Sequence, residues 1–389
     1  MSGAVQAPVY LDHAATTPVD PRVAVAMAEC LTEEGVFGNP ASATHAYGRE
    51  AAAALESARA DVAALVGTEP EAVIFTSGAT EADNLAIFGV AAASGAPGCH
   101  IVTQATEHKA VLDACLRLRR RGVEVTVLPT DSDGCVSSDR LAGALRPETR
   151  LVSIMHANNE TGVLQDIARL AAVCRDRGVL LHADAAQSAG RLPVDLHALG
   201  VDLLSLSAHK LYGPKGVGAL VVSPRARPCL EPQLAGGGQE RGLRPGTVAV
   251  HQAVGFAAAV RLVRAGRDAE SARLGLLGDR LAAALQALGG VRINGAGAPR
   301  LPGFVSASFD GVEGESLVAG LAELAVASGA ACDSATGEPS HVLRALGVSP
   351  ERAQATLRLT LGRGTTAADV ECAIAAVSRE VQRLRAIAP

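Results

Sequence analysis

Short apolar runs alternate with longer helical patterns between residues 71 and 223, and this alternation is the feature that most constrains the fold. The segments 80–93, 109–122 and 167–178 have the composition and length of helices. Strands that alternate with helices of this length form a mainly parallel sheet that is covered on both faces. We therefore predict an α/β fold with a mainly parallel sheet of the seven-stranded type. The runs assigned to strands are 72–76, 100–104, 123–129, 150–157, 179–187, 201–209 and 217–223.

The pattern changes near residue 250, which indicates a second, smaller domain. A long helical stretch at 251–288 is followed by strand-like runs at 304–310 and 356–361 and by a closing helical segment at 367–387. Helices and strands arranged in this way are typical of an α+β domain. The predicted domains are a large α/β domain at 16–255 and a small α+β domain at 256–389, to which residues 1–15 are joined.

Composition and charge exclude several classes of function. Of the 389 residues, 35 are Lys or Arg and 40 are Asp or Glu, which gives a net charge of −5 spread along the chain. This balance provides no basic surface for nucleic acid. No apolar run approaches the roughly 18 residues that span a membrane, and the start of the chain lacks the pattern of a signal peptide. The eight cysteines are scattered without a CxxC pair, so we expect a cytoplasmic protein with no disulfide framework and no metal site.

Polar and reactive side chains gather where four of the predicted strands end. The carboxyl ends of parallel strands meet at one edge of a sheet, and functional groups collect there. Taken singly, an Asp at a strand end is usually a turn former or a helix cap, and a Lys is usually a solvated surface charge. Their concentration at one edge favours a functional site. The side chains are His108, Asn158, Asn159, Glu160, Asp184, Gln187, Ser207, His209 and Lys210.

The same set suits a cofactor that combines a pyridine nitrogen, an aldehyde and a phosphate. Pyridoxal 5′-phosphate (PLP) requires a lysine for its Schiff base and a carboxylate that keeps the ring nitrogen protonated, and Lys210 and Asp184 suit these roles. The small residues at 77–80 lie between a strand and a helix, where backbone N–H groups and the helix dipole favour an anion. An ordinary capped turn is the alternative at that position. The residues together predict PLP as the cofactor.

A series of motifs along the chain resembles one known family. The series is similar to that of the cysteine desulfurases of the NifS/IscS type, which belong to the class V aminotransferase group of fold-type I PLP enzymes. The resemblance extends from about residue 9 to about residue 387, and it implies the aminotransferase fold of type I. The motifs are "YLDHAATTP", "FGNPASATH", "FTSGATEADN", "TEHKAV", "HANNETG", "HADAAQS", "SAHKLYGPKG", "GGGQERGLRPGT" and "SGAACDSATGEPSHVLRALG".

The resemblance implies roles for the cofactor-binding residues. Lys210 would carry the cofactor and move the α-proton of the substrate. Asp184 would pair with the ring nitrogen, and Gln187 would hydrogen-bond the ring hydroxyl. His108 would stack on the ring and assist in proton transfer. The residues that would hold the phosphate are Ala79, Thr80, Ser207 and His209.

The resemblance also implies a substrate and a second subunit. Asn159, which would also contact the cofactor, and Arg358 would bind the carboxylate of L-cysteine, and a guanidinium can do so as a bidentate fork. Thr247 would reach the phosphate bound by the neighbouring subunit, which implies a homodimer.

Cys332 would receive the sulfur of the substrate as a persulfide and deliver it to an acceptor protein, for iron–sulfur cluster assembly or for thiolation. A thiolate is the nucleophile in such an attack, and a loop of Gly, Ala and Ser suits an accessible thiol. Asp333 would raise the pKa of this thiol if the two groups lie close together.

Two other functions share many of these residues. One is a selenocysteine lyase or another class V PLP transaminase or lyase that does not use Cys332. The other is an idle assembly subunit that keeps the fold. The presence of Lys210, Asp184 and His108 argues against an idle subunit, and we predict a PLP-dependent cysteine desulfurase.

Overall fold

A central sheet of seven strands organises the larger part of the molecule, as the sequence predicted. The computed structural model describes residues 7–328 and 339–387. The order across the sheet is β2-β8-β7-β6-β5-β3-β4; β2 and β7 run antiparallel to β8, and the other neighbours are parallel. The strands are β2 (Val73–Thr76), β3 (His100–Gln104), β4 (Glu124–Leu128), β5 (Thr149–Ser153), β6 (Leu180–Asp184), β7 (Leu203–Ser207) and β8 (Gly218–Val222).

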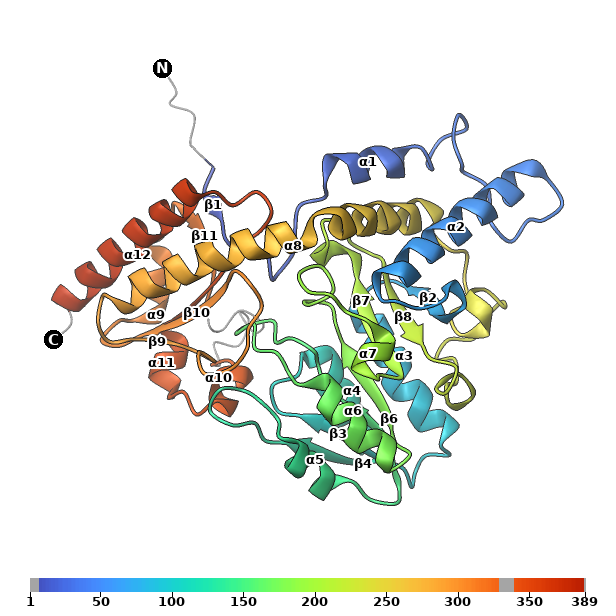
Figure 1. Ribbon diagram of the computed structural model, residues 1–389, viewed down its shortest axis with the longest axis horizontal. Helices are drawn as coiled ribbons and strands as arrows, with labels where there is room; N and C mark the ends of the chain where they lie inside the picture. Colours follow the sequence, from blue (N-terminus) through green and yellow to red (C-terminus); the bar gives the residue numbers. More distant parts are fainter. Residues whose placement is uncertain (1–6, 329–338, 388–389) are drawn as a thin grey trace.

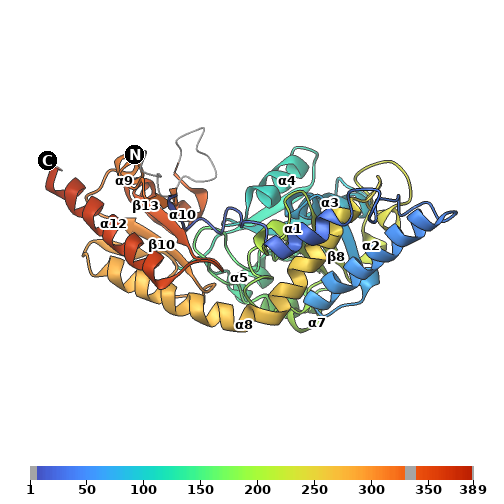
Figure 2. The same ribbon diagram turned by 90° about the horizontal axis from the view of Figure 1, so that it is seen from above.

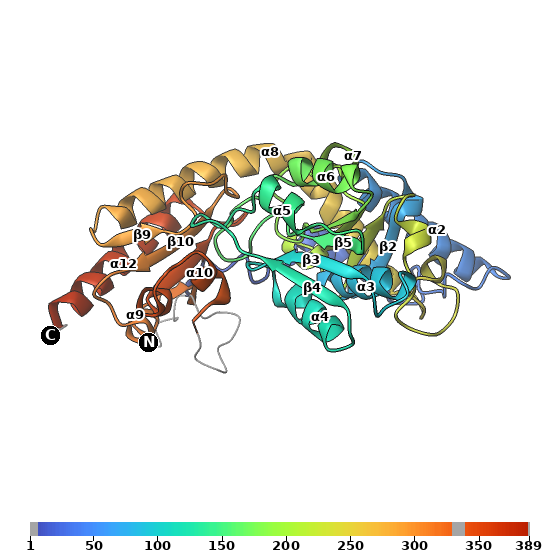
Figure 3. The same ribbon diagram turned by 90° about the horizontal axis from the view of Figure 1, so that it is seen from below.

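Helices cover both faces of this sheet, which lies between two layers in Figure 3. Helices α3 and α4 lie on one face, and α6 and part of α8 lie on the other. The helices of this part are α1 (Pro21–Ala28), α2 (Ala46–Leu65), α3 (Ala79–Ala93), α4 (Lys109–Arg119), α5 (Ser138–Ala144), α6 (Ile167–Asp176), α7 (Leu196–Leu199) and α8 (Val250–Gln286), with short 3-10 turns at η1 (Pro70–Ala72), η2 (Ala208–Lys210), η3 (Arg227–Cys229) and η4 (Glu240–Gly242).

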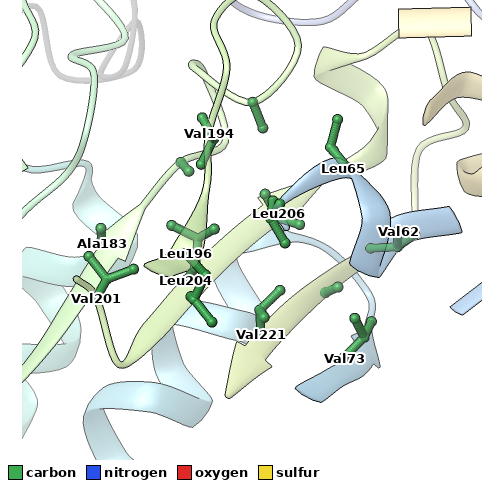
Figure 4. Packing of buried hydrophobic residues seen from close by; sticks show 14 of the residues in the cluster. Val62, Leu65, Val73, Ala183, Val194, Leu196, Val201, Leu204, Leu206 and Val221 are labelled. Carbon is green, nitrogen blue, oxygen red and sulfur yellow. The ribbon is translucent and has the colours of Figure 1, made fainter. Parts of the chain in front are cut away.

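Alternate side chains of each central strand enter different cores. In β7, Leu203 packs with the α3 and α4 side, whereas Leu204 and Leu206 pack with the side formed by α2, α6 and α8. Figure 4 shows Leu204 and Leu206 beside Val221 of β8 in the second of these cores. Because both faces are covered, these strands are continuous apolar runs rather than alternating ones.

A second, smaller sheet lies beside the first, and α8 extends along both (Figures 1 and 2). Its order is β12-β13-β10-β9, with all neighbours antiparallel, and its strands are β9 (Val291–Ile293), β10 (Phe304–Phe309), β12 (Ala327–Ser328) and β13 (Thr356–Thr360). Near the start of the chain, β1 (Val9–Tyr10) pairs in parallel with β11 (Leu324–Ala325). The helices here are α9 (Gly314–Ala319), α10 (His341–Ala345), α11 (Pro350–Gln354) and α12 (Ala367–Ile387).

The 37-residue helix α8 connects the two parts without a break. The predicted domain division between residues 255 and 256 falls inside this helix, and it stays a prediction. Helix α2, for which the sequence analysis made no prediction, packs against α8. None of the helices within the two described ranges combines the length and the apolarity needed to cross a membrane.

Candidate active site

A cavity of about 540 Å³ lies where the carboxyl ends of β6 and β7 approach the start of α3. It is bordered by residues from both parts of the molecule, because Arg358 comes from β13 of the small sheet. Most of the predicted site residues therefore share one cavity. Those that line it are Ala79, Thr80, His108, Asn159, Asp184, Gln187, Ser207, His209, Lys210 and Arg358.

Three of the predicted residues that the structure describes do not line this cavity. Two of them, Asn158 and Glu160, are buried and lie next to a lining residue in the sequence. Thr247 is exposed and borders a different depression, together with Asn39, Arg59 and Glu240. Its predicted contact with a phosphate in a second subunit stays a prediction. Cys332 and its neighbour Asp333 lie outside the described residues.

Asp184 is the last residue of β6, and the residue is 7 % exposed. Its Oδ1 accepts a hydrogen bond of 2.8 Å from the backbone N–H of Ala186. Burial raises the pKa of this carboxyl, whereas the Ala186 hydrogen bond, the neighbouring His108 and the ammonium of Lys210 oppose the rise. A cationic ring nitrogen placed here would favour the ionised carboxylate further.

Lys210 follows β7 in the turn η2, and its ammonium group is held by the N-terminal segment. Nζ donates to the backbone carbonyl of Ala14 and, at 2.8 Å, to that of Ala15. The amide of Gln187 donates to the same Ala14 carbonyl at 2.9 Å. The sequence analysis missed this role of the motif "YLDHAATTP", because a backbone carbonyl leaves no signal in a residue type.

The start of α3 is open to an anion. The N-cap residue is Gly78, which has no side chain to cap the first N–H groups of the helix. Glycine is also needed at Gly218 of β8, where a Cβ would lie 2.7 Å from the Cα of Gly78. Unpaired N–H groups and the positive end of the helix dipole stabilise a phosphate at such a position.

His209 and His108 are both neutral histidines at the border of the cavity. Burial and the nearby charges of Lys210 and Lys215 lower the pKa of His209 to about 4. Its Nδ1 lies 3.1 Å from the hydroxyl oxygen of Thr16. His108 caps α4, since its Nδ1 accepts from the N–H of Ala110 at 3.1 Å, and burial lowers its pKa. A neutral His108 with Nδ1 as acceptor carries its proton on Nε2.

Arg358 is 6 % exposed and joins the two parts of the molecule. Its guanidinium forms an ion pair of 2.7 Å with Asp12 and donates to the backbone carbonyl of Asn159 at 3.0 Å. Within residues 7–328 and 339–387, its Nε and the side-chain Oδ1 of Asn159 have no hydrogen-bond partner. These unpaired buried groups are available to a polar ligand. Asp12 is a member of the site that the sequence analysis did not identify.

Hydrogen bonds hold the start of α10 beside the cavity. This helix follows residues 329–338, which lie outside the described part of the chain. The hydroxyl of Ser340 donates to Glu160 at 2.5 Å, and His341 Nε2 lies 2.9 Å from the backbone carbonyl of Glu107. Burial raises the pKa of Glu160, and the Ser340 hydrogen bond opposes the rise. Ser340 and His341 were present in a quoted motif, but nothing in their type indicated these partners.

The donor set fits PLP. One cavity contains a lysine, a buried carboxyl that a cationic nitrogen would complement, and an uncapped helix start for a phosphate. These groups come from the ends of β7 and β6 and from the segment after β2, which are distant in sequence.

The chain is similar to known proteins over nearly its whole length. The pattern of the family described as aminotransferase class V matches residues 9–372. The chain belongs to this family. A protein named cysteine desulfurase IscS from Proteus mirabilis is 51% identical over 382 residues, which are 98% of this chain and 95% of that protein. The protein of the same name from Aeromonas hydrophila is also 51% identical, over the same shares of both chains.

Solved structures of similar proteins point to the same family as the relatives found by sequence. A NifS-like protein superposes with a TM-score of 0.89 at 35% identity, covering 97% of this chain and 100% of its own. DndA from Streptomyces lividans has a TM-score of 0.75 at 40% identity and covers 90% of this chain and 99% of its own. The predicted family, the type I fold and the PLP cofactor are thereby confirmed.

Proposed function

We propose that this protein removes the sulfur of L-cysteine in a PLP-dependent reaction that leaves L-alanine, and that Cys332 receives the sulfur as a persulfide. The observation that carries the proposal is the meeting of Lys210, Asp184 and Arg358 at one cavity. The cysteine desulfurases that are about half identical over nearly the whole chain support it.

Bound PLP supplies an aldehyde for the amino group of the substrate and a ring that withdraws electrons from the α-carbon. Lys210 would hold the cofactor and move the α-proton through Nζ, an atom that the carbonyls of Ala14 and Ala15 orient. The negative charge of Asp184 would keep the ring nitrogen protonated. His108 would stack on the ring, and Gln187 would donate to the ring hydroxyl.

Arg358 and Asn159 bind the substrate carboxylate. The guanidinium is already oriented by Asp12 and by the Asn159 carbonyl, so little side-chain freedom is lost when a carboxylate binds. The N–H groups at the start of α3 would hold the phosphate, together with the polar side chains of Thr80, Ser207 and His209, which line the same cavity.

The thiolate of Cys332 attacks the substrate sulfur, so that a sulfur–sulfur bond forms as the bond between that sulfur and the substrate's β-carbon breaks. The electron pair of the broken bond stays with the β-carbon, which takes up a proton and becomes the methyl group of alanine. The motif "SGAACDSATGEPS" supports this step by its likeness to the family. We further propose a homodimer in which Thr247 serves the neighbouring site. The persulfide passes to an acceptor protein of the cytoplasm, where the free thiols of the chain stay reduced.

Replacing Cys332 by serine tests the proposal. In the C332S variant we expect the visible absorption of the bound cofactor to remain, while transfer of cysteine-derived sulfur to a thiol acceptor falls at least about a hundredfold, because an activated nucleophile is lost. Cys229, the exposed cysteine among the described residues, offers the control C229S, which should transfer sulfur normally. Wild-type transfer by C332S would contradict the persulfide step. Faster turnover of selenocysteine than of cysteine by both proteins would favour a selenocysteine lyase.

A further inference from the structure

Asp83 is a buried carboxyl group to which the proposed mechanism gives no role. It lies in α3 beside the cavity and is only 1 % exposed. Neither of its carboxyl oxygens has a hydrogen-bond partner in the part of the chain that the structure describes. The nitrogen Nε2 of His182 lies 3.5 Å from Oδ1. An ionised carboxylate in such surroundings is very costly, and protonation removes that cost.

Glu107 is a second buried carboxyl near the same site. It directly precedes His108 and is fully buried. Its Oε1 accepts the backbone N–H of Met155 at 2.6 Å, whereas Oε2 has no hydrogen-bond partner among residues 7–328 and 339–387. One backbone hydrogen bond does not replace the hydration of a full charge.

The neighbouring histidine does not provide a positive charge. His182 lies between the hydroxyl oxygens of Ser153 and Ser205, at 2.8 and 2.9 Å from its two nitrogens. Its burial in β6 lowers the pKa to about 3, so the ring is neutral near pH 7. His182 therefore cannot balance a negative charge on Asp83.

Among the described residues, the ammonium of Lys210 acts on Asp184, and the neighbouring His108 also opposes the rise in its pKa. Burial raises the pKa of Asp83 well above its usual value, and the negative charges of Asp184 and Glu107 add to the rise. Burial likewise raises the pKa of Glu107 to about 8; Asp184 adds to the rise, whereas the Met155 N–H and the Gln104 side chain oppose it.

We propose that Asp83, Glu107 and Asp184 share their protons as one buried cluster, in which Asp83 and Glu107 stay protonated and leave Asp184 as the single negative charge facing the ring nitrogen of the cofactor. This inference rests on the proposed function, which assigns Asp184 to that nitrogen. It makes Asp83 and Glu107 positioning residues, which act on the cofactor through Asp184.

The arrangement has a consequence for the cofactor. Carboxyl groups at close range cannot all ionise at neutral pH, because each new charge raises the proton affinity of the others. If Asp83 or Glu107 ionised, Asp184 would bind a proton more tightly and would complement a cationic ring less well. Two neutral neighbours thus keep the charge where the cofactor requires it. Other ionisable groups near the cluster are Lys210, His108, His341, Cys115 and the neutral His182.

Infrared difference spectroscopy of the PLP-loaded protein tests this inference, since the C=O absorption of a protonated carboxyl is absent from Asn and Gln side chains. We expect D83N and E107Q each to remove one component that the wild type shows at neutral pH. The variant D113N, which alters an exposed carboxyl on α4, should remove none. In the wild type the Glu107 component should fade with a midpoint of about 8. The visible absorption of the cofactor should change with the same midpoint, and E107Q should lack that change.

The inference is overturned if D83N or E107Q retains every protonated-carboxyl component of the wild type. The visible absorption of the cofactor reports whether each variant has folded and is loaded. If a variant does not fold, the infrared spectrum of the wild type still tests the inference, because the absence of a buried protonated carboxyl at neutral pH would contradict the cluster. The proposed function is tested separately, by sulfur transfer in C332S. A negative result for the carboxyl cluster therefore does not contradict the proposed function, and a negative result for the proposed function can be told apart from it.

Discussion

The two sides of the active site are built differently. On the large-sheet side, Asp184 ends β6 and Lys210 follows β7, and the pairing of these two buried strands sets their separation. On the small-sheet side, Arg358 is placed by polar contacts that cross between the parts, to Asp12 and to the Asn159 carbonyl. The groups for cofactor chemistry thus depend on a rigid sheet, whereas the group for the substrate depends on how the two parts meet.

Removing Lys210 should have the largest effect and should act on the chemistry of the large-sheet side. In K210A we expect the absorption band of the covalently held cofactor to be lost and alanine formation to fall at least about a thousandfold, because both the attachment and the proton transfer depend on Nζ. Lys215 also borders the cavity but has no such role, and K215A should keep the covalent band. A K210A protein with the wild-type band would contradict the assignment.

Removing Arg358 should have an intermediate effect and should separate substrate binding from cofactor binding. In R358A we expect kcat/KM for cysteine to fall about 10- to 100-fold, mainly through KM, because a charge-assisted hydrogen bond is worth about 1.5–3 kcal/mol. The cofactor band should remain. The exposed pair of Arg352 with Asp310 provides a control, R352A, with little expected effect. A loss confined to kcat in R358A would count against substrate binding by this residue.

Removing the Ser340 hydroxyl should have the smallest effect and tests the anchor on the small-sheet side. This hydroxyl accepts from Val342 and Leu343 at the start of α10, and it also donates to buried Glu160. S340A should lower the free energy of unfolding by about 1–2 kcal/mol in urea denaturation. S349A removes the cap of α11, whose single hydrogen bond is 3.4 Å long and exposed, and it should cost less. Equal losses in both variants would contradict the anchor.

Prediction from the sequence succeeded where the rules are local. The apolar runs identify the central strands, and the rule that functional groups collect at carboxyl ends predicts that Asp184 and Lys210 share one site, as they do in the cavity. No helix or strand was predicted before residue 71, although α2 is an Ala-rich helix of 20 residues. The apolar face of α2 packs against α8, which comes almost 200 positions later in the chain, so its partner could not be identified from the local sequence.

Contacts between segments that are distant in the chain could not be predicted from the sequence. Asp83 and Glu107 both lay inside quoted motifs, but their types suggested solvated carboxylates rather than buried acids. The carbonyls of Ala14 and Ala15 are features of the backbone, which every residue type shares. Asp12 was read as part of a motif, and its bond to Arg358 spans most of the chain.

The sequence by itself determined the alternation of strands and helices, the edge at which reactive groups gather, and the chemistry that Lys210 and Asp184 can perform. These follow from periodicity and residue type, which are local properties. Only the tertiary structure decided which carboxyls lose their water, which carbonyls hold Lys210, and how Arg358 reaches the site from the second sheet. Desolvation and charge pairing depend on neighbours in space, and those neighbours are set by the packing of the whole chain.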